Sequence, residues 1–293
     1  MTHDLRTQAW TQEGIVARWH LVGEGVAPGA ADWAMRELRR PFSGVSVTGW
    51  GPVTVQQQRW AATLTAPDTA LSLASAGGFW KIRHDLGYYV TVTRPGTRGR
   101  TRSGRLHVCY SKTLAGNVVV VNGLRVTTPE RTIIDLWPSM DATARSKMLR
   151  EALRLQVTNP LELLAVLHTH RGRRGVARLR DELLRRMHLP FHRCRSDAEA
   201  FALVVLDDAG IPPPHVNKRF AGEEADLCWP ERQEIIEIDG PQFHRFKDED
   251  ARKTAIWTAA GLRVRRISSD LLFTQPSQLL LLAPPPLTLP RTR

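Results

Sequence analysis

Residues 223–239 constrain the fold of this chain more than any other stretch. Residues 225–229 and 234–239 have the composition of short β-strands, and Pro230 begins the turn between them. Gly240, followed by a proline, ends the second run. The sequence therefore predicts a β-hairpin at this position.

One face of the predicted hairpin is acidic. Glu237 and Asp239 share a face because side chains alternate along a strand, and pairing of the strands brings Asp226 close to them. His244 follows a few residues later. Clustered carboxylates repel each other and lose hydration when buried, and a divalent cation relieves both penalties. The pattern predicts a Mg²⁺ or Mn²⁺ site with Asp226, Glu237 and Asp239 as ligands.

The alternative interpretation of the acidic face is a strand edge that faces solvent, where charged residues are common. Two features favour the metal site. Asp226 stands between apolar residues, and Asp239 with Gly240 ends a strand, which is where α/β folds place their ligands.

The ordered set Asp226, Glu237-Ile-Asp239-Gly240 and His244 resembles the C-terminal domain of the Vsr-like (very short patch repair-like) branch of the PD-(D/E)XK nuclease superfamily. The resemblance covers about a third of the chain. It implies a restriction-endonuclease-like mixed sheet flanked by helices. It also implies that a metal ion held by the carboxylates activates water to cleave a DNA phosphodiester.

The superfamily usually has a lysine two positions after the glutamate, and this chain has Asp239 there. The Vsr-like branch is similar in lacking that lysine and in pairing Glu-x-Asp-Gly with a nearby histidine. The resemblance thus makes His244 the base or water-positioning residue. Lys247 and Lys253 are alternatives for the missing lysine, and Gln242 is an outer candidate.

Ser196 and Glu199 have the spacing of a helix capping box. The nuclease resemblance offers a second role for Glu199, as a catalytic acid on the first helix of the domain, and both interpretations stay open. A strand over 215–220, a helix over 248–260 and a strand over 262–267 complete an α/β order.

The N-terminal residues have the pattern of a winged helix-turn-helix, with helices over 11–20 and 29–40 and a strand over 45–48. Basic side chains fall on or near the exposed face of the second helix. They either contact DNA or form a solvated charged face. These residues are Arg36, Arg39 and Arg40.

Residues 51–137 predict two helices, three strands over 88–93, 105–111 and 117–121, and a final helix capped by Thr128. An arginine-rich loop joins the first two strands, and no acid relieves its charge. It suits contact with phosphates, and a solvated hairpin tip is the alternative. The arginines proposed for DNA contact are Arg98, Arg100 and Arg102.

Residues 8–137 resemble the AbiEi family of antitoxins, mainly through SLASAGGFW at 72–80 and TPERTIIDL at 128–136. That resemblance implies a DNA-binding wing, a role in transcriptional control and a cognate toxin as a partner. Residues 139–190 predict three helices with a dense basic surface that includes Arg173 and Arg174. This surface either leads DNA to the nuclease-like domain or is merely solvated.

The charge and cysteine content favour a nucleic-acid-binding protein of the cytoplasm. Lys and Arg number 41 against 29 Asp and Glu, for a net charge of +12, and a basic balance of this size favours a polyanionic partner. The three cysteines lack metal-site spacing, which favours a reducing compartment. No apolar stretch approaches the length of a membrane span.

Together these patterns predict an α/β chain, α+β overall, in five parts. They are a winged-helix-like unit at 1–50, an AbiEi-like region at 51–137, a basic helical linker at 138–192, a restriction-endonuclease-like domain at 193–283 and a proline-rich tail at 284–293. The leading function is a metal-dependent DNA endonuclease in repair or phage defence. The alternatives are a catalytically inactive DNA-binding regulator or antitoxin and an RNA-directed nuclease. The oligomeric state stays open.

Overall fold

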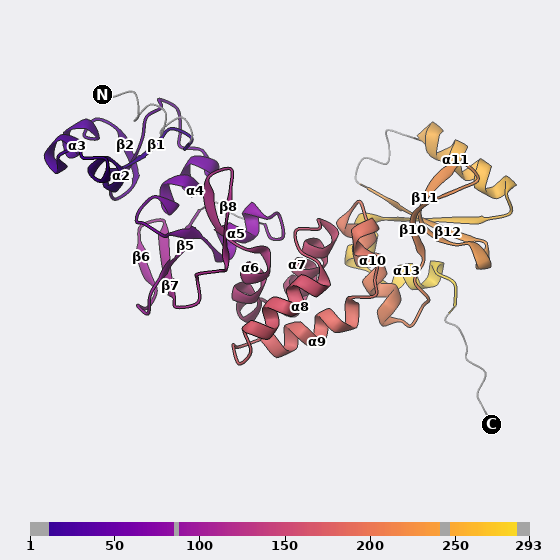
Figure 1. Cartoon of the computed structure of the whole chain (residues 1–293). Helices are drawn as coiled ribbons and strands as arrows, with labels where there is room; N and C mark the ends of the chain where they lie inside the picture. The colour runs from indigo at the N-terminus through magenta and orange to yellow at the C-terminus, as the bar shows by residue number, and fades with distance from the viewer. Residues whose placement is uncertain (1–11, 85–87, 241–246, 286–293) are drawn as a thin grey trace. The chain divides into compact units, whose positions relative to one another are not determined.

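The computed structural model describes residues 12–84, 88–240 and 247–285. The chain is a mixed α/β protein, α+β overall. It divides into two compact units, one made of Met1–Met140 with Ala165–Val176 and the other of Asp141–Leu164 with Ala177–Arg293. Figure 1 labels the elements of both units.

The first unit contains two sheets and five helices among its described residues. Its strands are β1 (Ile15–Ala17), β2 (Arg39–Phe42), β3 (Val45–Val47), β4 (Ala70–Leu71), β5 (Val90–Pro95), β6 (Thr101–Ser103), β7 (Leu106–Ser111), β8 (Val118–Val121) and β9 (Leu124–Thr127). Its helices are α2 (Arg18–Gly23), α3 (Pro28–Ala34), α4 (Val55–Thr63), α5 (Leu73–Phe79) and α6 (Pro129–Leu136), followed by the 3₁₀ turn η1 (Trp137–Ser139).

The two N-terminal helices are shorter than the sequence predicts. Ile15 is fully buried and pairs with Val47 in the antiparallel sheet β1-β3-β2, so the predicted helix over 11–20 is wrong before Arg18. The helix predicted over 29–40 ends at Ala34, and Arg39–Phe42 is a strand paired with β3. Pairing with a strand from elsewhere in the chain outweighs local helical spacing at both places.

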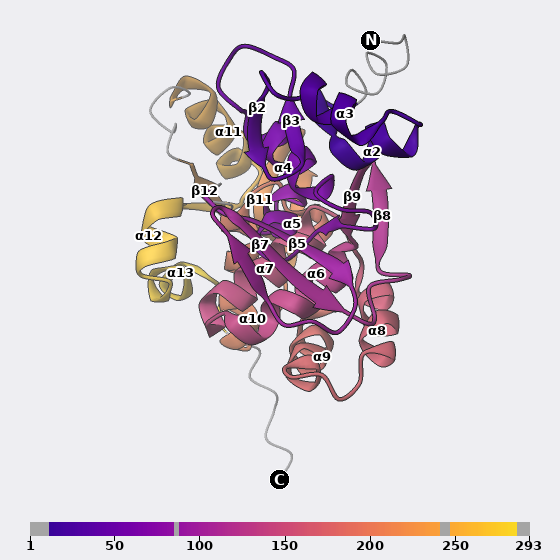
Figure 2. The ribbon, with the colours of Figure 1, turned by 90° about the vertical axis from the view of Figure 1, so that its left-hand side faces the viewer.

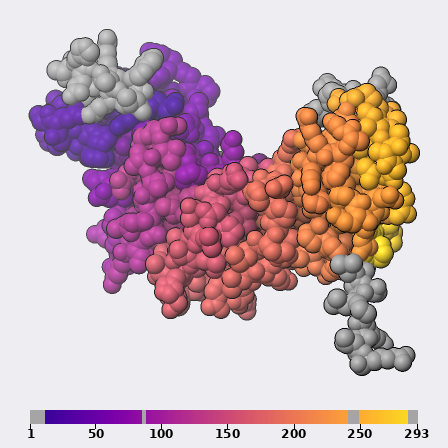
Figure 3. Space-filling view, turned by 45° about the vertical axis from the view of Figure 1, so that its right-hand side comes forward, coloured from indigo at the N-terminus to yellow at the C-terminus, as the bar shows by residue number. Residues whose placement is uncertain are grey.

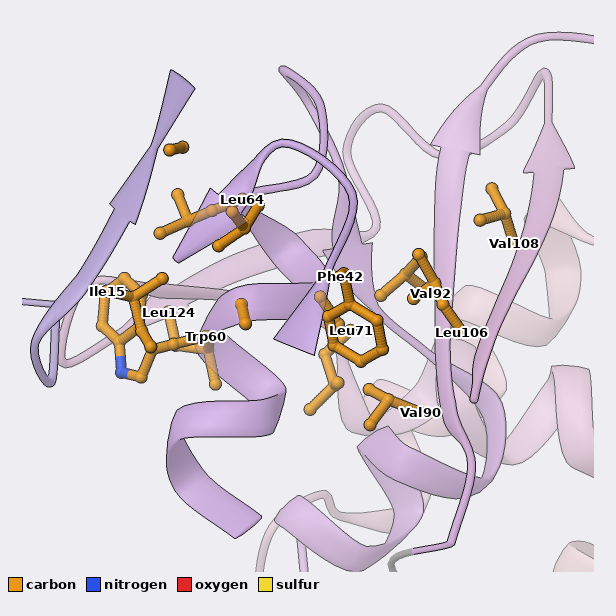
Figure 4. Close-up of a cluster of buried hydrophobic side chains, with 14 of the residues drawn as sticks. Ile15, Phe42, Trp60, Leu64, Leu71, Val90, Val92, Leu106, Val108 and Leu124 are labelled. Atoms are coloured by element: carbon orange, nitrogen blue, oxygen red, sulfur yellow. The ribbon is translucent and has the colours of Figure 1, made fainter. Parts of the chain in front are cut away.

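The second sheet of this unit has the order β6-β7-β5-β4-β9-β8. The three strands predicted from the sequence are confirmed as β5, β7 and β8, while β4, β6 and β9 were not predicted. The core gathers side chains from both sheets: Ile15, Trp60 and Leu124 lie together, and Phe42, Leu71 and Val90 continue the layer (Figure 4). The chain before residue 50 therefore shares its core with the residues that follow.

The TPERTIIDL stretch forms α6, and its polar side chains have structural roles here. The Thr128 hydroxyl accepts a hydrogen bond from the backbone N–H of Arg131 at 3.2 Å, which confirms the predicted cap. The Arg131 side chain is 2% exposed, with Nε 2.8 Å from Asp135 Oδ2 and Nη1 2.5 Å from the Thr113 carbonyl oxygen. Arg131 thus ties the helix to the loop after β7.

The remaining elements run from residue 142 to residue 282. The helices are α7 (Ala142–Arg154), α8 (Pro160–Thr169), α9 (Val176–Arg186), α10 (Asp197–Asp208), α11 (Lys247–Ala259), α12 (Ser269–Thr274) and α13 (Ser277–Leu282). The strands are β10 (His215–Phe220), β11 (Glu223–Trp229), β12 (Glu234–Asp239) and β13 (Arg263–Ser268), with 3₁₀ turns η2 (Phe191–Arg193) and η3 (Pro230–Arg232). The three helices predicted over residues 139–190 are confirmed as α7, α8 and α9.

The predicted hairpin forms the centre of a four-stranded mixed sheet with the order β10-β11-β12-β13. β11 and β12 are antiparallel, and β12 and β13 are parallel because α11 carries the chain back across the sheet. Figure 1 shows α11 on one side of this sheet and α13 on the other. In the space-filling view, α11 lies at the surface of the second unit (Figure 3).

The side of the sheet that faces α11 is held by one buried tryptophan. Trp257 of α11 is fully buried in a cluster with Cys228 and Ile235, and its ring N–H donates to the Phe220 carbonyl oxygen at 3.1 Å. This anchor fixes α11 over the centre of the hairpin. Among the helices described, none is long and apolar enough to cross a membrane.

Candidate active site

The acidic residues of the hairpin lie on the side of the sheet that α11 covers. Cys228 is opposite Ile235 in the β11–β12 register, and both belong to the buried cluster of Trp257. Because side chains alternate, Glu237 and Asp239 share the face of Ile235. The sheet and α11 therefore enclose the acidic cluster between them.

Asp226 and Glu237 hold the end of the hairpin through their side chains. The backbone N–H of Asp226 donates to Glu237 Oε1 at 3.0 Å, and the backbone N–H of Ile238 donates to Asp226 Oδ2 at 2.8 Å. The other oxygens, Asp226 Oδ1 and Glu237 Oε2, accept no hydrogen bond from the described residues. Each carboxylate is thus oriented through one oxygen by a backbone N–H of the opposite strand.

Burial and mutual repulsion make this pair electrostatically unfavourable when both groups are ionised. Burial raises the pKa of Asp226, and the charge of Glu237 raises it further. Burial also raises the pKa of Glu237, whose exposed fraction is 7%. A buried acid pair of this kind favours either a shared proton or a bound cation.

Two basic side chains border the pair. The positive charge of Lys253, from α11, lowers the pKa of both Asp226 and Glu237 against the effect of burial. Arg266 of β13 is next to Glu237 in the parallel register, and its Nη1 lies 2.8 Å from Asp239 Oδ1. Lys253 is therefore a lysine whose positive charge acts on both carboxylates of the pair.

Asp239 forms an ion pair with a described cationic side chain. Arg266 pairs with Asp239 and also lies 3.4 Å from Asp250 Oδ1 of α11. Burial raises the pKa of Asp239, and the charge of Arg266 opposes this shift. The sequence interpretation did not include Arg266 or Asp250. The parallel β12–β13 pairing that places Arg266 joins residues too far apart for a local pattern to predict.

The predicted capping box forms only in part: the Ser196 hydroxyl caps α10 by accepting from the Glu199 backbone N–H at 3.1 Å, whereas the Glu199 side chain bonds groups other than the Ser196 backbone N–H. Glu199 Oε1 accepts from the Ser196 hydroxyl at 2.7 Å, and its Oε2 accepts from the Arg195 backbone N–H at 2.9 Å and from Asn217 Nδ2 at 2.6 Å. Both oxygens are therefore occupied. The charge of Glu199 nevertheless raises the pKa of Asp226, so this side chain borders the acidic pair.

Three further candidates lie outside the described residues. These are His244, Gln242 and the side chain of Lys247. Their predicted roles stay predictions.

The predicted DNA-binding arginines fall in different settings. Arg36 lies beyond the end of α3 and pairs with Glu37 at 2.9 Å, while Arg39 and Arg40 belong to β2. The expectation that these three lie on a helix is therefore wrong. Arg173 is bound to Asp135 at 2.5 Å, and Arg174 is exposed.

The arginine-rich loop forms an exposed edge of the first unit. Arg98 and Arg100 lie between β5 and β6, and Arg102 lies in β6, where every residue is exposed. The structure thus brings these three arginines together on one β-connection. Exposed guanidinium groups on such an edge suit contact with phosphates.

The donor set at the hairpin suits a hard divalent cation. Asp226 and Glu237 each present one carboxylate oxygen, which is the ligand type that Mg²⁺ and Mn²⁺ prefer, with water and substrate oxygens completing the shell. Within the described ranges, no three His, Cys, Asp or Glu residues converge as a complete protein cage.

Comparison with known proteins identifies no relative of this chain. No protein-family model matches the chain, and a search of curated proteins finds no match.

Proposed function

We propose that the second unit is a divalent-metal-dependent DNA endonuclease with a restriction-endonuclease-like, Vsr-like PD-(D/E)XK fold. The observation that carries the proposal is the buried Asp226–Glu237 pair, in which one oxygen of each accepts a backbone N–H of the opposite strand and the other accepts no hydrogen bond from the described residues. The hairpin, the crossing helix α11 and the parallel strand β13 support the fold assignment.

In this proposal Asp226 and Glu237 hold Mg²⁺ or Mn²⁺. The ion supplies Lewis-acid activation of water and of the phosphodiester. Lys253 contributes positive charge beside the pair, where negative charge develops on the phosphate during hydrolysis. Arg266 neutralises Asp239 and keeps this carboxylate oriented at the end of β12.

The first unit supplies DNA binding in the same proposal. β1 pairs with β3 and β3 with β2, while α2 and α3 stand between β1 and β2 in the chain, which is the strand and helix order of a winged helix. The exposed arginines 98, 100 and 102 add sequence-independent contact with phosphates.

A DNA-binding regulator without nuclease activity is the second candidate. Its support is specific: Asp239 is already paired with Arg266, and both oxygens of Glu199 accept hydrogen bonds. Two of the four described acidic candidates are thus engaged in structural interactions.

Cleavage of supercoiled plasmid separates the two candidates. We expect nicking by the wild-type protein with Mg²⁺ or Mn²⁺, none with EDTA, and loss of at least about a hundredfold in rate for Asp226→Asn and Glu237→Gln. Glu231→Gln is the matched control, because Glu231 lies in the turn at the opposite end of the same hairpin. DNA binding without cleavage under every metal condition contradicts the endonuclease and supports the regulator.

A further inference from the structure

The last strand of the six-stranded sheet is an unprotected apolar edge. β8 consists of four consecutive valines, and within the described chain only β9 pairs with it (Figure 2). Val119 is 37% exposed and Val120 is 61% exposed. Edge strands are normally protected by charge, proline or a bulge, and β8 has none of these.

The hydrogen bonds of the hairpin show which groups of β8 point outward. The backbone N–H of Thr128 donates to the Asn117 carbonyl oxygen at 3.0 Å, and the register runs from Val118↔Thr127 to Val121↔Leu124. Because hydrogen-bonded pairs alternate in an antiparallel ladder, Val119 and Val121 bond to β9. The backbone N–H and C=O groups of Val118 and Val120 therefore point away from β9.

We propose that β8 binds β8 of a second copy of this chain, in an antiparallel pair centred on Val119. In this register Val118 lies opposite Val120 of the second copy. The outward backbone N–H and C=O groups of each valine can therefore hydrogen-bond to those of the other. A register centred on Val118 or Val120 leaves one outward residue of each strand without such a partner. The geometry thus selects one pairing.

The side chains of β8 suit pairing with a second copy. Val119 is opposite the fully buried Val126 of β9, so a Val119–Val119 contact across the twofold axis extends the existing core layer. Pairing of identical strands is closed by a twofold axis, which ends the assembly at two chains.

The other edge of the same sheet does not offer an equivalent surface. β6 is fully exposed and carries Arg102, with Arg98 and Arg100 in the preceding loop. Two β6 edges would repel each other because both carry these positive charges. Pairing of β6 with β8 would be a head-to-tail contact, which a twofold axis does not close.

A contact of one short strand per chain belongs to the weak, reversible class of interfaces. The dimer is therefore expected to depend on protein concentration. It does not depend on the proposed endonuclease activity, because β8 and the acidic hairpin belong to different units.

Substitution of Val120 tests the backbone contact by sedimentation velocity of the full-length chain. Val120→Pro removes an outward N–H without removing a bond to β9, so we expect the dissociation constant of the dimer to rise by at least about tenfold. Val120→Thr keeps the N–H and the β-branched shape, and we expect a change of less than about threefold. A wild-type chain that stays monomeric at all concentrations overturns the proposal, as does a dimer that Val120→Pro leaves unchanged.

Cysteine crosslinking tests the register and does not require the proline variant to fold. In the proposed pair the two Val119 Cα atoms are about 4.5 Å apart, within disulfide range. Val119→Cys should form a disulfide dimer under mild oxidation. The Val121 pair is separated by about 13 Å along the strands, so Val121→Cys should not. Equal crosslinking of both variants, or none by Val119→Cys above the background of the native Cys109, overturns the register.

Discussion

Asp226 and Glu237 take the place of main-chain acceptors where the β11–β12 ladder ends. Each accepts one backbone N–H from the opposite strand, which orients the carboxylate but does not neutralise it. A hydrogen bond from a neutral amide offsets only part of the cost of burying a charge. The pair is therefore oriented by the backbone, while its burial and mutual repulsion keep a charge cost that a cation would relieve.

The first prediction concerns the pH dependence of stability in EDTA. Burial and Glu237 raise the pKa of Asp226, so the folded state binds a proton more tightly than the unfolded chain. A raised carboxyl pKa contributes stability that is lost as pH rises from the usual value of about 4 towards the folded-state value. Urea unfolding from about pH 5 to about pH 8 should show this loss in the wild type and a smaller loss in Asp226→Asn.

Glu231→Gln is the control for that series and should retain the wild-type profile. Parallel profiles for the wild type and Asp226→Asn would contradict the assignment of the pH dependence to this carboxyl pair.

At the scale of elements, the β8–β9 hairpin depends on one glycine. Gly123 has φ +83°, and a Cβ at this position would lie 2.9 Å from Trp60 Cη2 of α4. The substitution Gly123→Ala therefore meets both backbone strain and a buried ring. Gly116 has φ +76° but no atom within 4 Å of the Cβ position.

Alanine variants of these two glycines separate the cost of backbone strain from the cost of the steric clash with Trp60. Gly116→Ala should cost about 1–2 kcal/mol for the left-handed backbone, and Gly123→Ala should cost about 1–3 kcal/mol more because Trp60 must move. Chemical denaturation of both variants measures the difference. Equal losses of stability would mean that Trp60 does not constrain the turn.

Secondary structure could be predicted from the sequence where neighbouring residues determine it. It could not be predicted where it depends on pairing with residues far away in the chain. Thr128 and Ser196 cap their helices as predicted, and Asp141 caps α7 in the same way, because a cap is complete within one turn. The acidic hairpin is also local. The strand at Ile15 and the partnership of Arg266 with Asp239 depend on residues about 30 positions away in sequence, and no periodic pattern contains them.

At the scale of the whole molecule, the arginine-rich edge and the acidic pair belong to separate units. Arg98, Arg100 and Arg102 are in the first unit, and Asp226 and Glu237 are in the second. The net charge of +12 supports a polyanionic partner for the chain. Binding and catalysis should therefore respond to different substitutions.

Replacing the three arginines by alanine should weaken DNA binding. The slope of log K against log salt should fall by about one for each phosphate that the variant no longer neutralises. Fluorescence anisotropy with labelled duplex DNA in EDTA measures this slope, and Asp226→Asn should leave it unchanged. A triple variant with the wild-type slope would show that this edge does not bind phosphates.

The most direct test of the account is calorimetric titration of the full-length chain with Mn²⁺. We predict that the wild type binds Mn²⁺, that Asp226→Asn and Glu237→Gln each weaken binding by at least about tenfold, and that Glu231→Gln changes it by less than about twofold. Absence of binding by the wild type, or binding that both hairpin substitutions leave unchanged, would contradict a cation site built from Asp226 and Glu237.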